Sequence, residues 1–384
     1  MPTTLPALAR FPGTASCYHG GAFFDAIGPG FEDLERRHHI INADVLDAWF
    51  APAPAVLEAL TSDLDWLART SPPTNCEGLI EAIARARGVP GECVLAGAGS
   101  SDLIFRAFAR WLTPESRVLL LDPTYGEYAH VCEQVIGCRT ERLTLERATN
   151  YRLDLDQLHA RLQFGDFDLT ILVNPNNPTG QYVPRDALED VLRRVPADTL
   201  VWIDEAYLEY VEGAESLEQF ASQMPNVVVC KSMSKAYALS GLRVAYLCGA
   251  AERIAPLRAW TPPWVVGLLA QLAGVRALQE CDYYAARYRE TAEVRRELVR
   301  ALRQRCGEWE ILESVANFVL CHLPTEGPTA ATLVERCRRH GLFLRDVGNM
   351  GTQTGPRLLR IAVKDMATQA RMMEVLEVVQ STRP

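Results

Sequence analysis

The sequence predicts an α/β fold in which a large domain built on a mostly parallel sheet precedes a smaller α+β domain. The 384 residues are 48% hydrophobic and 23% charged, which is ordinary globular composition with enough chain for two or three domains. Short apolar runs of strand length alternate with helical stretches through most of the chain. Such alternation is typical of a parallel or mixed sheet whose two faces are covered by helices.

Six apolar runs are the predicted strands of the large domain. They lie at residues 94–96, 117–121, 169–173, 200–203, 227–230 and 244–247. The helical patterns among them cover residues 101–112, 126–136, 185–195 and 216–223. Because the strand runs are continuously apolar, we expect them to form one sheet that is buried on both faces.

The character of the chain changes after about residue 252. A helical pattern over residues 265–303 leads into a region with predicted strands at 318–321 and 358–363 and predicted helices at 329–340 and 366–379. We therefore expect an N-terminal arm over residues 1–50, which belongs partly to the small domain, a large domain over 51–270 and a small domain over 271–384.

Charge and cysteine content exclude several classes of function. The net charge of −9 leaves no basic excess for neutralising phosphates, so we expect no nucleic-acid partner and no membrane partner. No apolar stretch reaches the roughly 18 residues that a membrane span needs, and residues 1–12 lack the pattern of a signal peptide. The eleven cysteines form no C-x-x-C pair, which fits a cytoplasmic protein with reduced thiols and no metal site.

Lys235 is the residue with the most informative surroundings. Ser232 and Ser234 precede it closely, and Arg243 follows eight residues later. A lysine amine can form an imine with an aldehyde, while hydroxyls and a guanidinium can hold a phosphate dianion. An enzyme that binds pyridoxal phosphate needs this combination. The alternative is an ordinary surface lysine.

Gly99, Ser100 and Ser101 form a small-residue turn between a predicted strand and a predicted helix. Backbone amides can approach an anion closely there, and the helix N-terminus favours negative charge. Asp102 stands where a dinucleotide fingerprint needs its third glycine, and the turn has no Gly-Lys-Ser/Thr. A plain strand–helix turn with a capping serine is the alternative.

Two further turns follow predicted strands, at the sheet edge where open α/β folds bind ligands. One is the rigid Pro- and Asn-rich turn over residues 174–180, in which the amide of Asn177 could donate to a phenolate oxygen. The other contains Tyr125, whose ring could lie flat on a planar cofactor. A structural turn and a core aromatic residue are the respective alternatives.

Asp204 ends an apolar strand, where a charge is costly unless it is paired. Its carboxylate could bind a protonated pyridine nitrogen and so keep the ring cationic, as pyridoxal-phosphate chemistry requires. Tyr207, three residues later, could donate to the phenolic oxygen of the same ring. A helix-capping aspartate is the alternative.

Together these motifs resemble those of the fold-type I pyridoxal-phosphate enzymes, the aspartate aminotransferase superfamily, over about residues 19–380. The resemblance implies that Lys235 carries the cofactor and later moves the proton, that Asp204 holds the pyridine nitrogen, and that Tyr125 stacks on the ring. It implies that Asn177 and Tyr207 hold the phenolic oxygen. The residues that it assigns to the phosphate are Gly99, Ser100, Ser101, Ser232, Ser234 and Arg243.

Two branches of this superfamily share short motifs with the chain. Residues 204–207, 234–236 and 316–320 resemble the histidinol-phosphate aminotransferase group. His19, in His-Gly-Gly, resembles the threonine-phosphate decarboxylase group, in which this motif contacts the substrate phosphate. In both groups, residues matching Arg345 and Arg360 bind the anionic group of the substrate, whereas we expect Arg357 to face solvent.

The chain also departs from the family. Ser71-Pro72-Pro73 stands where the group has a tyrosine that reaches the cofactor phosphate of the neighbouring subunit. Residues 42–50 replace the stretch that usually covers the substrate, and Asp44 and Asp47 within them could meet a cationic group or could be surface residues. The family forms its sites at a dimer interface, so we still expect a homodimer.

Three functions follow from this pattern. The first is a pyridoxal-phosphate-dependent aminotransferase acting on a small anionic amino acid or amino-phosphate, with a 2-oxo acid as acceptor. The second is a decarboxylase or other lyase of the threonine-phosphate decarboxylase type, since one scaffold serves both outcomes. The third, a non-catalytic phosphate-binding α/β protein, leaves the surroundings of Lys235 unexplained.

Overall fold

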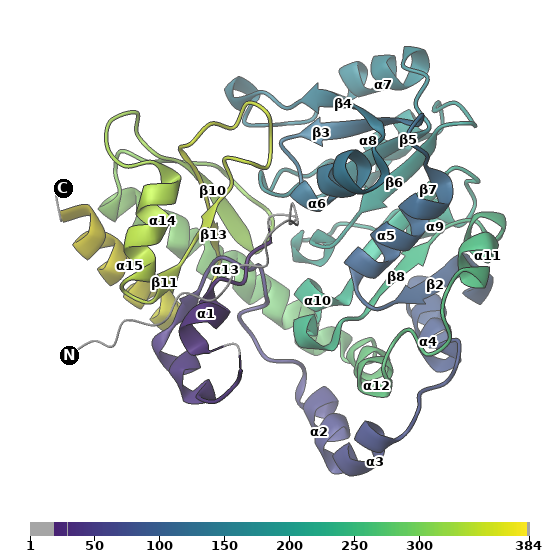
Figure 1. The fold of residues 1–384 in the computed structure, drawn as a ribbon, viewed down its shortest axis with the longest axis horizontal. Helices are drawn as coiled ribbons and strands as arrows, with labels where there is room; N and C mark the ends of the chain where they lie inside the picture. Colours follow the sequence, from purple (N-terminus) through teal and green to yellow (C-terminus); the bar gives the residue numbers. More distant parts are fainter. Residues whose placement is uncertain (1–18, 29, 382–384) are drawn as a thin grey trace.

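The computed structural model describes residues 19–28 and 30–381, which form two lobes with different sheets (Figure 1). The larger lobe contains a seven-stranded sheet, and the smaller lobe, yellow-green in Figure 1, contains a four-stranded sheet. A two-stranded parallel sheet joins β1 (Ile41–Asn42) to β11 (Leu342–Phe343) and so attaches the N-terminal arm to the smaller lobe. The predicted α/β fold class is confirmed.

All but one of the strands in the large sheet are parallel. Their spatial order is β2 (Val94–Gly97), β8 (Ala245–Cys248), β7 (Val227–Ser232), β6 (Leu200–Asp204), β5 (Leu169–Val173), β3 (Arg117–Asp122) and β4 (Arg139–Thr144). Only β8 runs against its neighbours. The carboxyl ends of the other six strands and the start of β8 therefore share one edge of the sheet.

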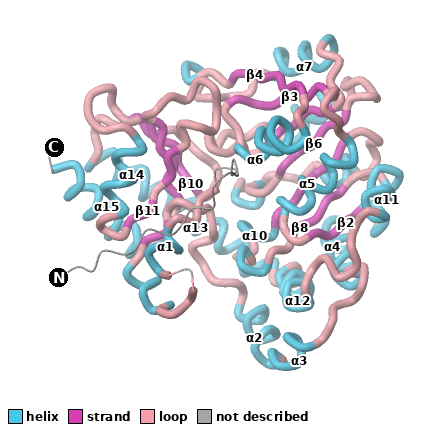
Figure 2. Tube along the Cα trace, viewed as in Figure 1, coloured by secondary structure: helices cyan, strands magenta, loops and turns pink. Residues whose placement is uncertain are grey.

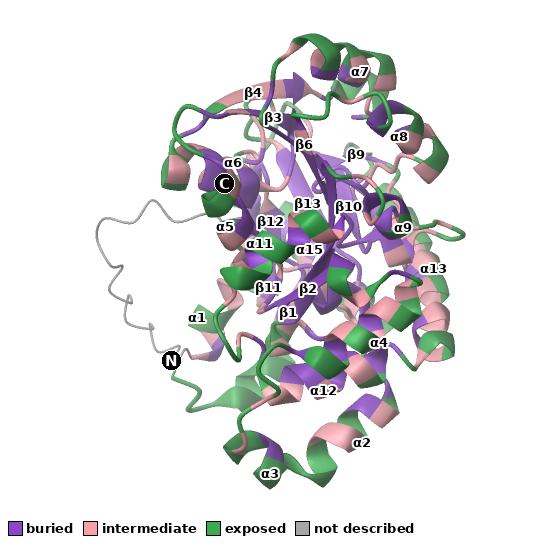
Figure 3. Ribbon diagram, turned by 90° about the vertical axis from the view of Figure 1, so that its right-hand side faces the viewer, coloured by how far each residue is buried: buried purple, intermediate pink, exposed green. Residues whose placement is uncertain are grey.

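Helices cover both faces of this sheet, and its strands lie in the interior (Figures 2 and 3). The apolar side chains of one face pack against α5 (Ser100–Trp111), η3 (His130–Ile136) and α11 (Ala251–Ala259). Those of the other face pack against α7 (Leu155–Phe164), α8 (Arg185–Leu192) and α9 (Glu218–Ala221). Helices α4 (Glu77–Arg87) and α12 (Leu268–Ala277) contact each other, and α12 also contacts α2 (Pro54–Ser62) and α3 (Leu64–Arg69).

The smaller lobe is an antiparallel sheet with helices. The strand order is β12 (Arg345–Asp346), β13 (Leu358–Ala362), β10 (Phe318–His322) and β9 (Glu310–Ile311). Its helices are α13 (Cys281–Arg305), α14 (Ala330–Arg338) and α15 (Met366–Ser381). Helix α13 contacts β9 and β10 of this sheet and also η5 (Leu208–Tyr210) of the larger lobe, so it connects the two lobes. The expected domain boundary near residue 270 stays a prediction.

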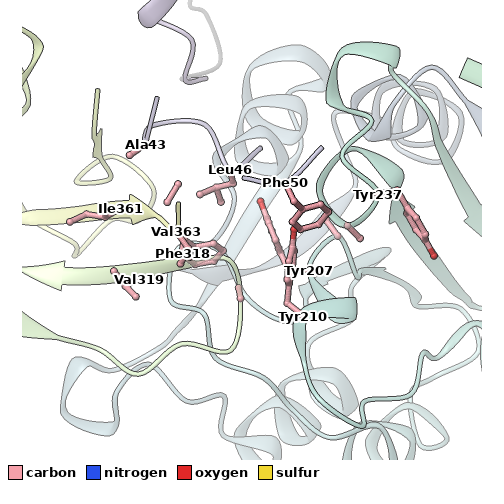
Figure 4. Close-up of a cluster of buried hydrophobic side chains, with 14 of the residues drawn as sticks. Ala43, Leu46, Phe50, Tyr207, Tyr210, Tyr237, Phe318, Val319, Ile361 and Val363 are labelled. Atoms are coloured by element: carbon pink, nitrogen blue, oxygen red, sulfur yellow. The ribbon is translucent and has the colours of Figure 1, made fainter. Parts of the chain in front are cut away.

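A cluster of buried apolar side chains fixes the arm between the lobes (Figure 4). Leu46 and Phe50 come from the arm, Tyr207 from the larger lobe and Phe318 from the smaller lobe. The Tyr207 and Phe318 rings meet edge to face with their centroids 5.3 Å apart. Burial of these large side chains holds three distant segments of the chain in one arrangement.

Two predicted elements need correction, and one strand was missed. The single helix expected over residues 265–303 is two helices, because Glu280 leaves the helical conformation (φ −97°, ψ 44°) and the chain turns between α12 and α13. The helix expected over 216–223 is only the four residues of α9. The edge strand β4 was not predicted, because its sequence Arg-Thr-Glu-Arg-Leu-Thr is largely polar.

Candidate active site

A cavity of about 650 Å³ lies where the arm, the edge of the large sheet and the smaller lobe meet. Of the predicted site residues, Gly99 and Ser234 alone do not line it. The lining residues that the sequence had singled out are His19, Ser100, Ser101, Tyr125, Asn177, Asp204, Tyr207, Ser232, Lys235, Arg243, Arg345 and Arg360. The parallel strands explain this convergence, since polar turns at their carboxyl ends meet at one edge.

Lys235 lies on the short helix α10 (Met233–Ala236), directly after β7. Its Nζ is 3.1 Å from Oδ1 of Asp47, and 20% of its side chain is exposed. Burial lowers the pKa of Lys235, Asp47 opposes that shift, and the cations Arg360 and Arg243 add to it. A lysine whose pKa is lowered holds more of its amine in the neutral form, which can attack a carbonyl or accept a proton.

Asp204 is held from two sides at the end of β6. Its Oδ2 accepts a hydrogen bond from the Tyr128 hydroxyl at 2.8 Å, and its Oδ1 accepts one from the backbone amide of Ala206 at 2.9 Å. Trp202 Nε1 in turn donates to the Tyr128 hydroxyl at 2.9 Å. Burial raises the pKa of Asp204 to about 6, and the two hydrogen bonds oppose that rise. A cationic ring nitrogen placed beside this carboxylate would stabilise its charged form.

Arg360 makes the principal contact between the lobes within the site. Its NH1 donates to Oδ1 of Asn177 at 2.7 Å, and its NH2 donates to the backbone carbonyl of Asp44 at 2.9 Å. Asn177 Nδ2 is 3.4 Å from the Tyr207 hydroxyl. The Nε of Arg360 is buried and has no hydrogen-bond partner among the described residues. A buried donor of this kind beside a cavity is suited to an anionic ligand.

Arg345 lies beside Arg360 because β12 pairs with β13 in a register that places the two residues opposite each other. Arg345 NH1 is 3.7 Å from Oδ1 of Asp44. The other oxygen of Asp44 accepts a hydrogen bond from the backbone amide of Gly21 at 3.0 Å. Asp44 thus connects the start of the described chain to the pair of arginines.

Gly99 and Ser234 both lie close to the guanidinium of Arg243, which lines the cavity. Gly99 has φ 91°, and a Cβ built on it would lie 2.3 Å from NH2 of Arg243, so only glycine lets the guanidinium approach the turn. Arg243 NH1 donates to the Ser234 hydroxyl at 3.3 Å. These groups, together with Ser100 and Ser232, fit the phosphate of pyridoxal phosphate, because they combine hydroxyls, backbone amides and one cation.

The structure shows two site residues that the motif analysis did not assign, Glu127 and Tyr128. Oε2 of the buried Glu127 accepts hydrogen bonds from Tyr125 and Ser101, both at 2.9 Å, and lies 3.3 Å from Nε2 of His19. Burial lowers the pKa of His19, and Glu127 acts to raise it. Both missed residues directly follow the Tyr125 turn, so their position after a strand end was the available indication.

Ser71 lies exposed in the loop between α3 and α4, and it does not line the cavity. Arg357, expected to face solvent, donates instead through NH1 to the backbone carbonyls of Pro324, Gly327 and Pro328. No group of three or more metal-ligating side chains occurs within residues 19–28 and 30–381. In the same residues, no helix combines the length and apolar character of a membrane span.

The Tyr128→Phe variant tests the hydrogen bonds around Asp204. Loss of the hydroxyl removes a donor that favours the charged carboxylate, so we expect the pKa of Asp204 in the cofactor-free protein to rise by about one unit. Isotope-edited infrared spectroscopy of the carboxyl group across pH would measure it. Tyr283→Phe removes a hydroxyl that donates to the Ala51 carbonyl at the surface and should leave this pKa unchanged. An unchanged pKa in Tyr128→Phe would show that this hydrogen bond does not stabilise the charged carboxylate.

Comparison with known proteins supplies the family. Residues 44–379 match the model of the family described as aminotransferase class I and II. The chain is 33% identical over 312 residues to histidinol-phosphate aminotransferase 1 of Cupriavidus pinatubonensis. This alignment covers 80% of this chain and 79% of the relative. It is 31% identical over 365 residues to histidinol-phosphate aminotransferase of Staphylococcus saprophyticus, with 94% and 96% covered.

Solved structures share the fold. Histidinol-phosphate aminotransferase from Sinorhizobium meliloti, in complex with pyridoxal-5'-phosphate, superposes with a TM-score of 0.81 at 23% identity and covers 98% of this chain and 100% of that one. L-threonine-O-3-phosphate decarboxylase from Porphyromonas gingivalis superposes with a TM-score of 0.77 at 22% identity, with 89% and 100% covered. With its match to the family model, the chain belongs to the aminotransferase class I and II family and is a pyridoxal-phosphate-dependent aminotransferase.

Proposed function

We propose that the protein transfers the amino group of a small anionic amino acid or amino-phosphate to a 2-oxo acid, with Lys235 as the proton-transferring residue. The observation that carries this proposal is the convergence of Lys235, Asp204 and Arg360 on one cavity. These residues supply a nucleophilic amine, a carboxylate for a ring nitrogen and a cation for the substrate.

Residues on the large sheet would hold the cofactor. Asp204 would hold the proton on the pyridine nitrogen, and Asn177 and Tyr207 would donate to the phenolic oxygen. Tyr125 would stack against the ring. The phosphate would lie against Gly99, Ser100, Ser101, Ser232, Ser234 and Arg243. When bound, pyridoxal phosphate supplies an electron sink for the charge that develops on the substrate carbon next to the amine.

Lys235 carries the proton transfer in this proposal. Its neutral amine accepts the proton from the substrate carbon at Nζ and later returns a proton from the same atom. The buried surroundings that lower its pKa increase the fraction of the amine that is neutral. Walls from the arm and the smaller lobe limit the access of water to the proton in transit.

Arg360 and Arg345 would bind the anionic group of the substrate. Both are at least nine-tenths buried, and they lie on neighbouring strands. A guanidinium offers two parallel donors to a carboxylate or a phosphate, which fixes orientation as well as charge. The relatives named histidinol-phosphate aminotransferase support an amino-phosphate as the substrate class. His19 lines the same cavity and would contact the same anionic group.

Decarboxylation is the second candidate reaction. The support for it is the His-Gly-Gly motif, whose resemblance is to the threonine-phosphate decarboxylase group and whose His19 lines the cavity. The difference between the two outcomes lies in which bond of the substrate stands perpendicular to the cofactor ring. The family match favours transamination.

A substrate screen read by cofactor absorbance tests the function. We expect the purified protein to be yellow, to lose its colour with borohydride and to consume an amino donor only when a 2-oxo acid is present. Lys235→Ala should be colourless and inactive. Release of carbon dioxide without a 2-oxo acid would assign the lyase reaction instead. A wild-type protein whose absorbance and activity do not change when pyridoxal phosphate is added would contradict the role of Lys235.

The Arg360→Ala variant tests anion binding. Loss of a buried charge-assisted contact should raise KM for the anionic donor by roughly thirtyfold or more, since such contacts contribute about 2 kcal/mol or more and 1.4 kcal/mol is tenfold. Arg357→Ala, three residues away, is the matched control and should leave KM unchanged. Circular dichroism of both variants checks the fold. Equal KM values for Arg360→Ala and wild type would reject the assignment.

We propose a cytoplasmic homodimer. Four large apolar side chains are each at least half exposed: Leu64 and Trp66 on α3, and Trp260 and Trp264 before α12. Exposed apolar side chains of this size are typical of interfaces. Analytical ultracentrifugation at micromolar concentration should show a dimer, and Trp66→Glu should weaken it; monomers alone in the wild type would contradict the proposal.

The ten described cysteines are free thiols, which supports a reducing compartment and can be checked by cell fractionation.

A further inference from the structure

We propose that Asp47 is the positioning residue of Lys235, which holds the lysine amine by an ion pair whenever that amine is not bonded to the cofactor. This inference rests on the proposed role of Lys235. It goes beyond that role because it assigns a function to a residue of the arm, which the motifs of the large sheet do not include.

The geometry of the pair carries the proposal. Oδ1 of Asp47 lies 3.1 Å from Nζ of Lys235, within hydrogen-bond distance. The side chains are 35% and 20% exposed, so the pair is partly shielded from water, and both residues line the cavity. A partly buried ion pair is screened less than a surface pair.

The backbone around Asp47 is held on both sides, so the direction of its carboxylate is set by the fold. Asn317 Nδ2 on the smaller lobe donates to the carbonyl of Leu46 at 3.0 Å. Trp49 Nε1 donates to the Thr291 hydroxyl on α13 at 2.9 Å. Leu46 and Phe50 are anchored in the buried cluster shown in Figure 4. Asp47 is thereby presented to Lys235 by contacts with the smaller lobe and α13.

The charged groups around the pair decide what the carboxylate does. Burial acts to raise the pKa of Asp47, but Lys235, Ser240 and Lys364 together lower it, so Asp47 is an anion at neutral pH. Lys364 faces Asp47 from the end of β13, where burial lowers its pKa to about 8. Arg360 and Arg243 are the cations that act on Lys235 from the other elements. Asp47 is therefore the anion that offsets a locally cationic environment at Nζ.

This position gives Asp47 a role in the proton transfer. When Lys235 acts as a base, the bond between carbon and hydrogen in the substrate breaks, a bond forms between Nζ and that proton, and the electron pair stays with the substrate carbon. The ammonium that results carries a full charge close to Arg360 and Arg243. The carboxylate of Asp47 stabilises this ammonium and keeps the lysine directed into the cavity.

The pH dependence of cofactor attachment to the cofactor-free protein measures the pair without using turnover. The neutral amine of Lys235 attacks the aldehyde carbon of pyridoxal phosphate, and water leaves as the carbon–nitrogen double bond forms. The rate constant therefore rises with pH through the pKa of the amine. In Asp47→Asn only burial and cations act on the amine, so we expect the midpoint to fall by about one pH unit.

Two variants control this measurement. Asp47→Glu retains the carboxylate and should restore most of the shift. Asp44→Asn removes a charge from the same segment, but that charge faces Arg345 and Gly21, so the midpoint should stay at the wild-type value. Circular dichroism and thermal melting identify a variant that fails to fold; if Asp47→Asn is one, Asp47→Ser, which also removes the charge, takes its place and should show the same lower midpoint.

Steady-state kinetics provide the second readout. We expect Asp47→Asn to lower kcat by roughly tenfold or more with little change in KM, and to move the acidic limb of the kcat profile to lower pH. An unchanged midpoint together with a raised KM for donors with a cationic side chain would overturn the proposal and make Asp47 a substrate-binding residue. If borohydride fails to fix the cofactor to Lys235 in the wild type, the proposed function fails; if it succeeds but the midpoints coincide, only this inference fails.

Discussion

The site depends on one buried guanidinium. Arg360 reaches from β13 of the smaller lobe to Asn177 at the edge of the large sheet and to the backbone carbonyl of Asp44 in the arm. Taking such a charge out of water is costly unless hydrogen bonds satisfy it, so the three segments must come together around it. The lobes then enclose a cavity, and Arg360 is one of the residues that line it. Domain packing and the proposed recognition of an anion therefore depend on the same residue.

Charged side chains of both signs line this cavity. The lining includes Lys235 and Arg243 of the larger lobe, Arg345 and Arg360 of the smaller lobe, and Asp44, Asp47 and Asp204. The buried Glu127 is hydrogen-bonded to two further lining residues, Tyr125 and Ser101. Each carboxylate has a defined partner or set of donors, such as Tyr128 for Asp204 and Lys235 for Asp47. In a partly dry cavity these pairs act more strongly than they would in water. This environment suits the anionic, planar cofactor and the anionic substrate proposed above, and its burial and cations lower the pKa of Lys235.

Sequence reasoning predicted the fold class and most strands because buried parallel strands are continuously apolar. It also found the polar turns that follow these strands, and the structure places their side chains around one cavity. It missed β4, whose edge position permits a polar sequence, and it joined α12 to α13, because the helical pattern continues across the break at Glu280. It also missed Glu127 and Tyr128, since nothing in the local pattern shows that a buried hydroxyl will donate to Asp204 from a turn 76 residues earlier.

By itself the sequence determined the local chemistry of this protein: the residue types, their spacing within each turn, and the strands that bring those turns to one edge. These features follow from short-range patterns of apolar and polar residues. The tertiary structure alone decided which distant side chains meet, above all Asp47 with Lys235, which are 188 residues apart, and Arg360 with Asn177, which are 183 apart. Such contacts depend on how two lobes and an arm pack together, and packing is a property of the whole buried core.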